Sequence, residues 1–159
     1  MATKIPEDLV DFLESGVSIL VGTRNAKLEP EATRCVGAQV SKDREHLTIF
    51  FPDWSRRAIS DIAENGEIAV CFSRMLDAYS IQLKGEGATV RDATDADRKV
   101  PERYIAAYIE TLSMAGFPRS LTTRIRVWPA KAVTFAVRDI FLQTPGPKAG
   151  ERLGEGAAK

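Results

Sequence analysis

The chain contains little histidine and little cysteine. Among its 159 residues there is one histidine, His46, and there are two cysteines, Cys35 and Cys71. A single imidazole excludes a multi-histidine metal site, and it leaves no Ser-His-Asp or Cys-His catalytic arrangement to expect. The two cysteines are far apart in the sequence and fit no zinc or redox spacing, so we expect two reduced core residues. These side chains predict no metal site, and they identify no catalytic residue.

Long apolar runs and an excess of charge of one sign are also missing. No apolar run approaches the roughly 20 residues that cross a bilayer. The first 12 residues contain acidic side chains where a signal peptide needs an uninterrupted apolar core. Lys plus Arg and Asp plus Glu number 22 each, and there is no basic run. We therefore expect a cytoplasmic protein, with neither nucleic acid nor a membrane as its main partner.

The remaining composition is typical of one globular domain. Apolar residues make up 44% of the chain and charged residues 28%. The length suits a single domain, residues 1–159, that buries a real core. Its last part, residues 138–159, ends in the Gly- and Pro-rich sequence QTPGPKAGERLGEGAAK. We expect this tail to be extended or mobile unless a partner holds it.

Hydrophobic patterning predicts more strands than helices. The clearest strand alternates polar and apolar residues and contains Gly85 and Gly87, which suggest a bend or bulge. Helices interrupt the strands only twice, so a doubly wound parallel sheet is not expected. A six-stranded, mostly antiparallel barrel with helices across its ends fits better, which is a mainly β (β+α) fold. The expected strands are 17–25, 31–42, 46–51, 67–74, 78–91 and 122–137, and the expected helices are 5–15, 54–64 and 94–115.

Two arginines stand where a helix dipole disfavours positive charge. The helix predicted at 54–64 carries Arg56 and Arg57 in its first turn, where each cation costs about 0.3–1 kcal/mol. An anion bound there would turn this energetic cost into a gain, because the free amides, the Ser55 hydroxyl and both guanidinium groups would point at one phosphate. The alternative is that both arginines are solvated, with Arg57 pairing with Asp61 four residues on.

A third arginine is predicted on an apolar strand face. In the strand expected at 31–42, alternation places Arg34 on the same face as Val36. A guanidinium buried there needs an acceptor, because an unpaired buried charge is costly. That acceptor is either a carboxylate of the chain or a bound ligand, and the sequence leaves both open. Gly37, in mid-strand, marks a bulge or a close approach by something flat.

In their order along the chain, these features resemble the pyridoxamine 5′-phosphate oxidase-like family, the FMN-binding split barrels. The resemblance covers roughly residues 5–137. It consists of an arginine in the second strand, an aromatic third strand, a Ser-Arg-Lys-like triplet at a helix start, an asparagine before a strand that ends in Phe, and a polar alternating strand that closes on Gly. The residues are Arg34, Val36, Phe50, Phe51, Ser55, Arg56, Arg57, Asn65, Phe72, Ser80, Gln82 and Gly85.

The resemblance implies a six-stranded antiparallel split β-barrel with flanking helices. It implies FMN as the cofactor and a homodimer with shared flavin sites. In that family the triplet and the region of the second-strand arginine hold the flavin phosphate, and the ring lies against the second and third strands. The residues implied to bind the cofactor are Arg34, Val36, Gly37, Phe51, Pro52, Trp54, Ser55, Arg56, Arg57, Ser80 and Gln82.

The implied function is an FMN-dependent oxidoreductase that passes electrons between a small-molecule substrate and oxygen or a nicotinamide. The chain departs from the family pattern at Arg57, where Lys is commoner. Residues 150–154 also lack the Arg-x-His pattern with which true pyridoxamine phosphate oxidases hold their substrate, which argues against that activity. Two alternatives remain open: a flavin- or ligand-binding sensor or stress-related protein without turnover, and a split barrel that binds a deazaflavin or haem.

Overall fold

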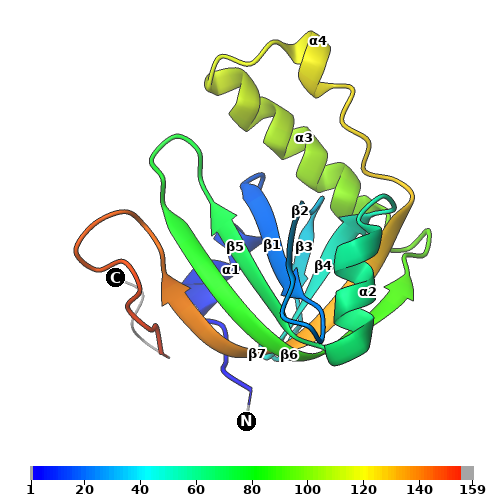
Figure 1. Ribbon diagram of the computed structural model, residues 1–159. Coiled ribbons are helices and arrows are strands. Elements are labelled where there is room, and N and C mark those ends of the chain that lie inside the picture. The colour runs from blue at the N-terminus through cyan, green and yellow to red at the C-terminus, as the bar shows by residue number, and fades with distance from the viewer. Residues whose placement is uncertain (1, 155–159) are drawn as a thin grey trace.

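The computed structural model describes residues 2–154 and consists of one antiparallel sheet of seven strands with helices packed around it (Figure 1). The strand order is β2-β1-β5-β6-β7-β4-β3. The mainly β fold with flanking helices that the sequence predicts is confirmed. In chain order the elements are α1 (Glu7–Leu13), β1 (Ser18–Arg24), β2 (Pro30–Arg34), β3 (Ala38–Val40), β4 (His46–Pro52), α2 (Arg56–Asn65), β5 (Ile68–Ser73), β6 (Ser80–Asp92), α3 (Lys99–Met114), α4 (Arg119–Thr122) and β7 (Ala130–Leu142).

The strand predicted at 31–42 is two strands in the structure, so the sheet has seven strands and not six. β2 pairs with β1 at one edge of the sheet, and β3 pairs with β4 at the other. The segment between them bonds to both edges: the Cys35 amide donates to a β1 carbonyl at 3.1 Å, and the Val36 amide donates to a β4 carbonyl at 2.8 Å. Gly37 has a φ of +147°, which side chains disfavour. One kinked segment therefore joins the two edges, consistent with a split barrel.

The middle of the sheet is tightly packed where β6 crosses the core. A Cβ atom on Gly85 would lie 1.9 Å from the ring of Phe135, so β6 meets this ring with bare backbone. The pairing of β6 with β7 shifts register between Lys84 and Gly85 and again after Glu86, and Gly87 has a φ of +62°. The bend or bulge predicted at Gly85 and Gly87 is confirmed.

The last strand begins later than the sequence predicts. It starts at Ala130 rather than at residue 122, and residues 119–122 form the short helix α4. Pro118 stands just before α4, where its fixed φ suits a helix start, and the chain then runs outside the sheet until Ala130. The Thr- and Val-containing sequence 122–129 has the composition of a strand but pairs with none of the strands described in residues 2–154.

The C-terminal part of the chain is held by the sheet as far as Leu153. Residues 138–142 belong to β7. The chain then turns back, and Leu153 is buried, with its amide donating to the Ile140 carbonyl at 2.8 Å. A buried leucine anchors the tail in a way that its Gly and Pro content does not reveal. Residues 155–159 of the predicted tail lie outside the described residues.

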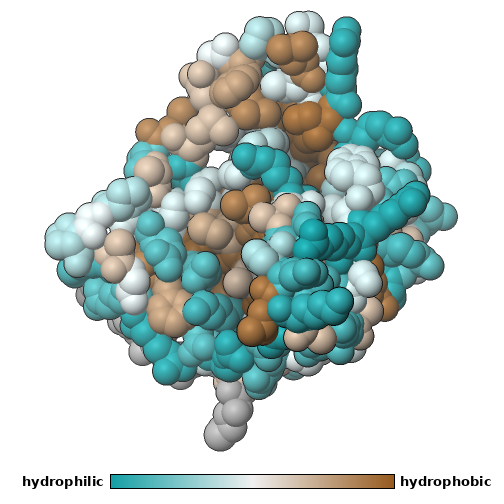
Figure 2. Space-filling view, in the orientation of Figure 1, coloured by the Kyte–Doolittle hydropathy of each residue, from teal (hydrophilic) through white to brown (hydrophobic). Residues whose placement is uncertain are grey.

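Helices α3 and α4 form an arm that extends beyond the sheet (Figure 1). The middle of α3 packs closely against Gly16, because a Cβ on this glycine would lie 2.4 Å from the backbone carbon of Ala107. We call residues 99–125 the α3–α4 arm. Figure 2 shows apolar surface over this arm and in the hollow below it. Within residues 2–154, no helix combines the length and the hydropathy needed to cross a bilayer.

Candidate functional site

The loop after β4 places the predicted arginine pair at the start of α2. The helix begins at Arg56, and the buried Ser55 precedes it. The Ser55 hydroxyl does not cap the helix but shares a hydrogen bond of 2.8 Å with the hydroxyl of Thr33 on β2. Within residues 2–154 the amides of Arg57 and Ala58 have no hydrogen-bond acceptor. The positive end of α2 therefore keeps two N–H groups for an external acceptor.

Both arginines of the pair are exposed and only weakly neutralised. The Arg57 Nε atom lies 3.4 Å from Glu31 Oε2, and among the described residues Arg56 has no ion pair. Exposed pairs of this kind contribute about 0–1 kcal/mol. The alternative pair of Arg57 with Asp61 is wrong, because Asp61 is buried and accepts a hydrogen bond from the Thr23 hydroxyl at 2.9 Å. Arg56 and Arg57 line an open groove of about 830 Å³.

Arg34 is exposed, which corrects its expected place on a buried strand face. The alternation that groups Arg34 with Val36 does not continue through the kinked segment, where Cys35 and Val36 are both buried. The Arg34 guanidinium donates to the Ser18 hydroxyl at 2.8 Å and has no ion pair within residues 2–154. Within residues 2–154 its acceptor is thus a neutral hydroxyl and not a carboxylate, and the alternative of a bound ligand stays a prediction. The remaining N–H groups of Arg34 are available.

Arg34 lines a cavity of about 510 Å³ between the sheet and the α3–α4 arm, which we call the aromatic cavity. From the sheet side it is lined by Val36, Pro52 and Trp54, all predicted site residues. The arm contributes its other wall, and Figure 2 shows the apolar surface there. The residues of that wall are Tyr104, Tyr108, Leu112, Phe117, Leu121, Thr122 and Ile125.

Stacked aromatic rings give the aromatic cavity its character. The rings of Tyr104 and Tyr108 lie with centroids 5.4 Å apart and planes inclined by 15°. Burial raises the pKa of the Tyr104 hydroxyl, and it raises the pKa of the Cys35 thiol beside the cavity as well. Both groups therefore remain protonated and neutral at physiological pH. The cavity offers hydrogen-bond donors and flat apolar surface, but no side chain that carries negative charge.

The structure divides most of the predicted site residues between the aromatic cavity and the groove at the start of α2. Arg34, Val36, Pro52 and Trp54 line the aromatic cavity, whereas Arg56 and Arg57 line the groove at the start of α2. The buried Ser55 lines neither. Neither the aromatic cavity nor the groove at α2 is lined by all three arginines.

Besides Ser55, four predicted residues face neither cavity. Phe51 is fully buried, so its side chain lies in the core and not, as expected, in a ligand-binding wall. Gly37 is approached by the start of α3, where Val100 and Pro101 would lie 3.4–3.5 Å from a Cβ. Ser80 is buried and donates to Ser73 Oγ at 2.8 Å. Gln82 lies opposite Cys71 on β5, three strands from Arg34 in the sheet.

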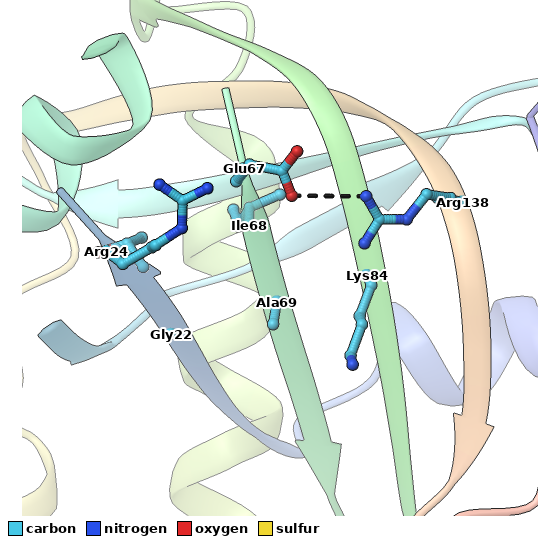
Figure 3. A pocket seen from close by; sticks show the side chains of 8 residues that line it. Gly22, Arg24, Glu67, Ile68, Ala69, Lys84 and Arg138 are labelled. Atoms are coloured by element: carbon cyan, nitrogen blue, oxygen red, sulfur yellow. Dashed lines mark hydrogen bonds and ion pairs between the residues drawn. The ribbon is translucent and has the colours of Figure 1, made fainter. Parts of the chain in front are cut away.

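A further hollow of about 280 Å³ lies on the outer face of the sheet (Figure 3). Gly22 and Ala69 are paired at its floor, and Arg24, Lys84 and Arg138 surround them. The charge of Arg138 is largely used within the chain, since it pairs with Glu67 at 3.5 Å, with Glu86 at 3.7 Å and with Asp139 at 3.0 Å. This hollow is weaker as a site than the aromatic cavity, and it contains none of the predicted residues.

Comparisons with known proteins support the fold. No protein-family model matches the chain, and no curated protein matches its sequence. Three solved structures are similar over most of their length. HupZ of group A Streptococcus has a TM-score of 0.55 at 19% identity, covering 92% of this chain and 99% of that one. An F420 reductase has a TM-score of 0.56 at 13% identity, with 86% and 98% covered. A candidate pyridoxamine 5′-phosphate oxidase from Lactobacillus delbrueckii has a TM-score of 0.52 at 14% identity, with 89% and 99% covered.

The chain has the fold of these proteins. The resemblance stated from the sequence is thereby confirmed for the fold. At identities below 20% the likeness carries no residue roles, so the site must be argued from this chain's own geometry.

Within this split-barrel fold, the sequence missed the arm as part of the site. Tyr104, Tyr108 and Leu112 recur on one side of the helix predicted at 94–115, but such a stripe alone does not show whether it faces a core or a cavity. The contribution of Ile125 was hidden because its segment, 122–137, was predicted as a strand, and Leu121 lies just before that segment, outside every predicted element. One signal was available: two tyrosines in one stripe supply hydroxyl groups that a closed apolar core does not need.

Proposed function

We propose that the protein binds FMN and acts as a flavin-dependent oxidoreductase on a small molecule. The observation that carries this proposal is the start of α2, where Arg56 and Arg57 stand beside two amides without acceptors. A phosphate monoester is the ligand that such a set of donors fits. Proteins of the same fold include an F420 reductase and a candidate pyridoxamine 5′-phosphate oxidase, which supports a flavin-type cofactor.

The residues beside the helix end fit the rest of the cofactor. Trp54 and Pro52 belong to the loop that leads into α2, and with Val36 they offer apolar surface to a flat ring. Bound FMN would supply the electron and hydride transfer. The chain would hold the phosphate at α2, cover one face of the ring with these apolar residues, and leave the other face open.

A homodimer is part of the proposal. On the outer sheet face, Leu20 is 44% exposed and lies in one cross-strand row with Arg34, Cys71 and Gln82. A second copy packed on this face would cover Leu20 and bring Gln82 into a site formed by two subunits. A cytoplasmic location, expected from the sequence, also remains part of the proposal.

The test is FMN titration by calorimetry of the wild type, the double variant Arg56→Ala/Arg57→Ala and the control Lys99→Ala. We expect the double variant to bind FMN at least about tenfold more weakly, which is about 1.4 kcal/mol, because two charge-assisted contacts are lost. Lys99 is exposed and lines neither cavity, so its replacement should leave the affinity within about twofold.

Three results bear on the proposal in different ways. Equal affinities of all three proteins would contradict the phosphate site at α2. A wild type that takes up no FMN would contradict FMN as the cofactor. Sedimentation of the same samples tests the dimer. A monomeric protein that binds FMN with full affinity would contradict a site shared between two subunits.

A deazaflavin is the second candidate, and the TM-score of 0.56 to an F420 reductase favours it. Its phosphate-bearing side chain would use the same arginine pair. Parallel titrations with FMN and F420 distinguish the two cofactors. A turnover assay of the bound cofactor with an added reductant then distinguishes an enzyme from a binding protein.

A further inference from the structure

We infer that the aromatic cavity binds a flat aromatic molecule with one anionic group, such as an aromatic monocarboxylate, whose anion lies on Arg34. As the substrate of the proposed oxidoreductase this molecule rests on the proposed function. As a ligand of the cavity it stands on the lining residues alone and can be tested without cofactor.

The walls of the cavity expose more apolar side-chain surface than the folding of the chain explains. Trp54 is 56% exposed, and on the arm Phe117 and Leu121 are 50% and 59% exposed. All three line the cavity. Side chains of this size left in water cost free energy that a bound apolar molecule would recover. The volume of about 510 Å³ falls within the range of roughly 300–1,000 Å³ that small-molecule sites span.

The shape of the lining selects a flat molecule. Tyr104 and Tyr108 are already stacked, with planes within 15° of each other, and Trp54 adds a third aromatic side chain from the loop before α2. Aromatic pairs of this kind contribute about 0.5–1.5 kcal/mol beyond the area they bury. A planar ring can extend the stack, whereas a branched aliphatic molecule cannot.

The charge of the lining selects an anion. Arg34 is the one charged residue among those that line the cavity, and no carboxylate lines it. The guanidinium makes one hydrogen bond, to the Ser18 hydroxyl, and within residues 2–154 it has no ion pair. Arg56 and Arg57 line a different groove, so a phosphate held at α2 leaves Arg34 available for a second anion. The raised pKa of Tyr104 keeps that hydroxyl neutral, so it adds no repulsion.

The experiment uses 2-naphthoate and its neutral analogue 2-naphthamide, which share the ring and differ in charge. Calorimetry measures the affinity of each for the wild type, for Arg34→Gln and for the control Lys99→Gln. We expect the wild type and Lys99→Gln to prefer naphthoate at least tenfold, and Arg34→Gln to bind both probes within twofold of each other. Arg34 is exposed, so the variant should fold, and circular dichroism checks this.

A second series locates the ring and separates the inference from the proposed function. Tyr108→Ala should weaken both probes at least fivefold, because it removes part of the stack. Wild type loaded with FMN should still bind naphthoate. A wild type without preference for the anion, or unchanged binding of both probes to Tyr108→Ala, would overturn the inference, as would complete displacement of naphthoate by FMN. Failure to bind FMN together with an Arg34-dependent preference would reject the proposed function and leave the inference standing.

Discussion

The sheet core and the α3–α4 arm bury their large side chains to very different degrees. Four phenylalanines of the sheet are at most 1% exposed, whereas four large apolar residues of the arm are 39–67% exposed. The core leaves no room for change, and the arm holds apolar surface that the chain itself does not cover. Stability should therefore depend on the sheet and recognition on the arm. The residues compared are Phe50, Phe51, Phe72 and Phe135 in the sheet, and Met114, Phe117, Leu121 and Ile125 in the arm.

Gly85→Ala should give the largest effect, because it adds a methyl group where the core has no space. The new Cβ would lie 1.9 Å from the buried ring of Phe135. We expect the free energy of unfolding, measured by urea denaturation, to fall by about 3 kcal/mol. Gly22→Ala is the matched control, since that strand glycine has nothing within 4 Å of a Cβ and should tolerate the change. Equal stability of the two variants would show that the core is looser than described.

Gly16→Ala should give an intermediate effect, because the added methyl group presses on the middle of α3 instead of on the sheet core. Its Cβ would lie 2.4 Å from the backbone of Ala107, but α3 lies at the periphery and can shift. We expect a loss of about 1–2 kcal/mol in the free energy of unfolding, together with weaker naphthoate binding. A loss as large as that of Gly85→Ala would mean that arm and sheet are packed alike, and the contrast between them would fail.

Asp97→Asn should give the smallest effect and should depend on pH. The Asp97 carboxylate accepts hydrogen bonds from Arg91 at 2.6 Å and from the Thr94 amide at 2.8 Å, just before α3. The hydrogen bond from Arg91 lowers the pKa of Asp97 below its usual value, an effect that burial partly opposes. A lowered folded-state pKa stabilises the fold above the unfolded-state pKa of about 3.9, and this contribution is lost as the pH falls through the folded-state pKa.

We therefore expect Asp97→Asn to cost about 1 kcal/mol at pH 7. The difference from the wild type should shrink below about pH 4, as measured by thermal unfolding at several pH values. Asp95→Asn, in the same turn, is the control and should match the wild type at every pH. A difference that stays constant from pH 7 to pH 2 would contradict the role given to the Asp97 charge.

The fold was largely predictable because its signals are local. Alternation in β6, the bulge at Gly85 and Gly87 and the helix after β4 all follow from short-range pattern, and all are present. The split of the second strand was not predictable in this way. It depends on Cys35 and Val36 bonding to strands at opposite edges of the sheet, and such long-range pairing leaves no periodic trace.

The candidate site was predictable in its residues more than in its layout. The pair Arg56 and Arg57 is found at the exposed start of a helix, as the local sequence indicates. The exposed position of Arg34 was not predictable, because the strand alternation was extended across a kink that interrupts it. The arm residues were missed because Leu121 and Ile125 acquire a role only from the place to which α3 carries them.

The kinked segment Cys35–Gly37 has a mechanical consequence for the whole barrel. The Cys35 amide is bonded to β1 and the Val36 amide to β4. Separation of either strand from the sheet therefore breaks hydrogen bonds of the same short segment. Opening of the barrel is then one cooperative event instead of two independent ones. Cys35 and Val36 also line the aromatic cavity, so a guest seated there would resist that opening and raise the melting temperature of the entire sheet.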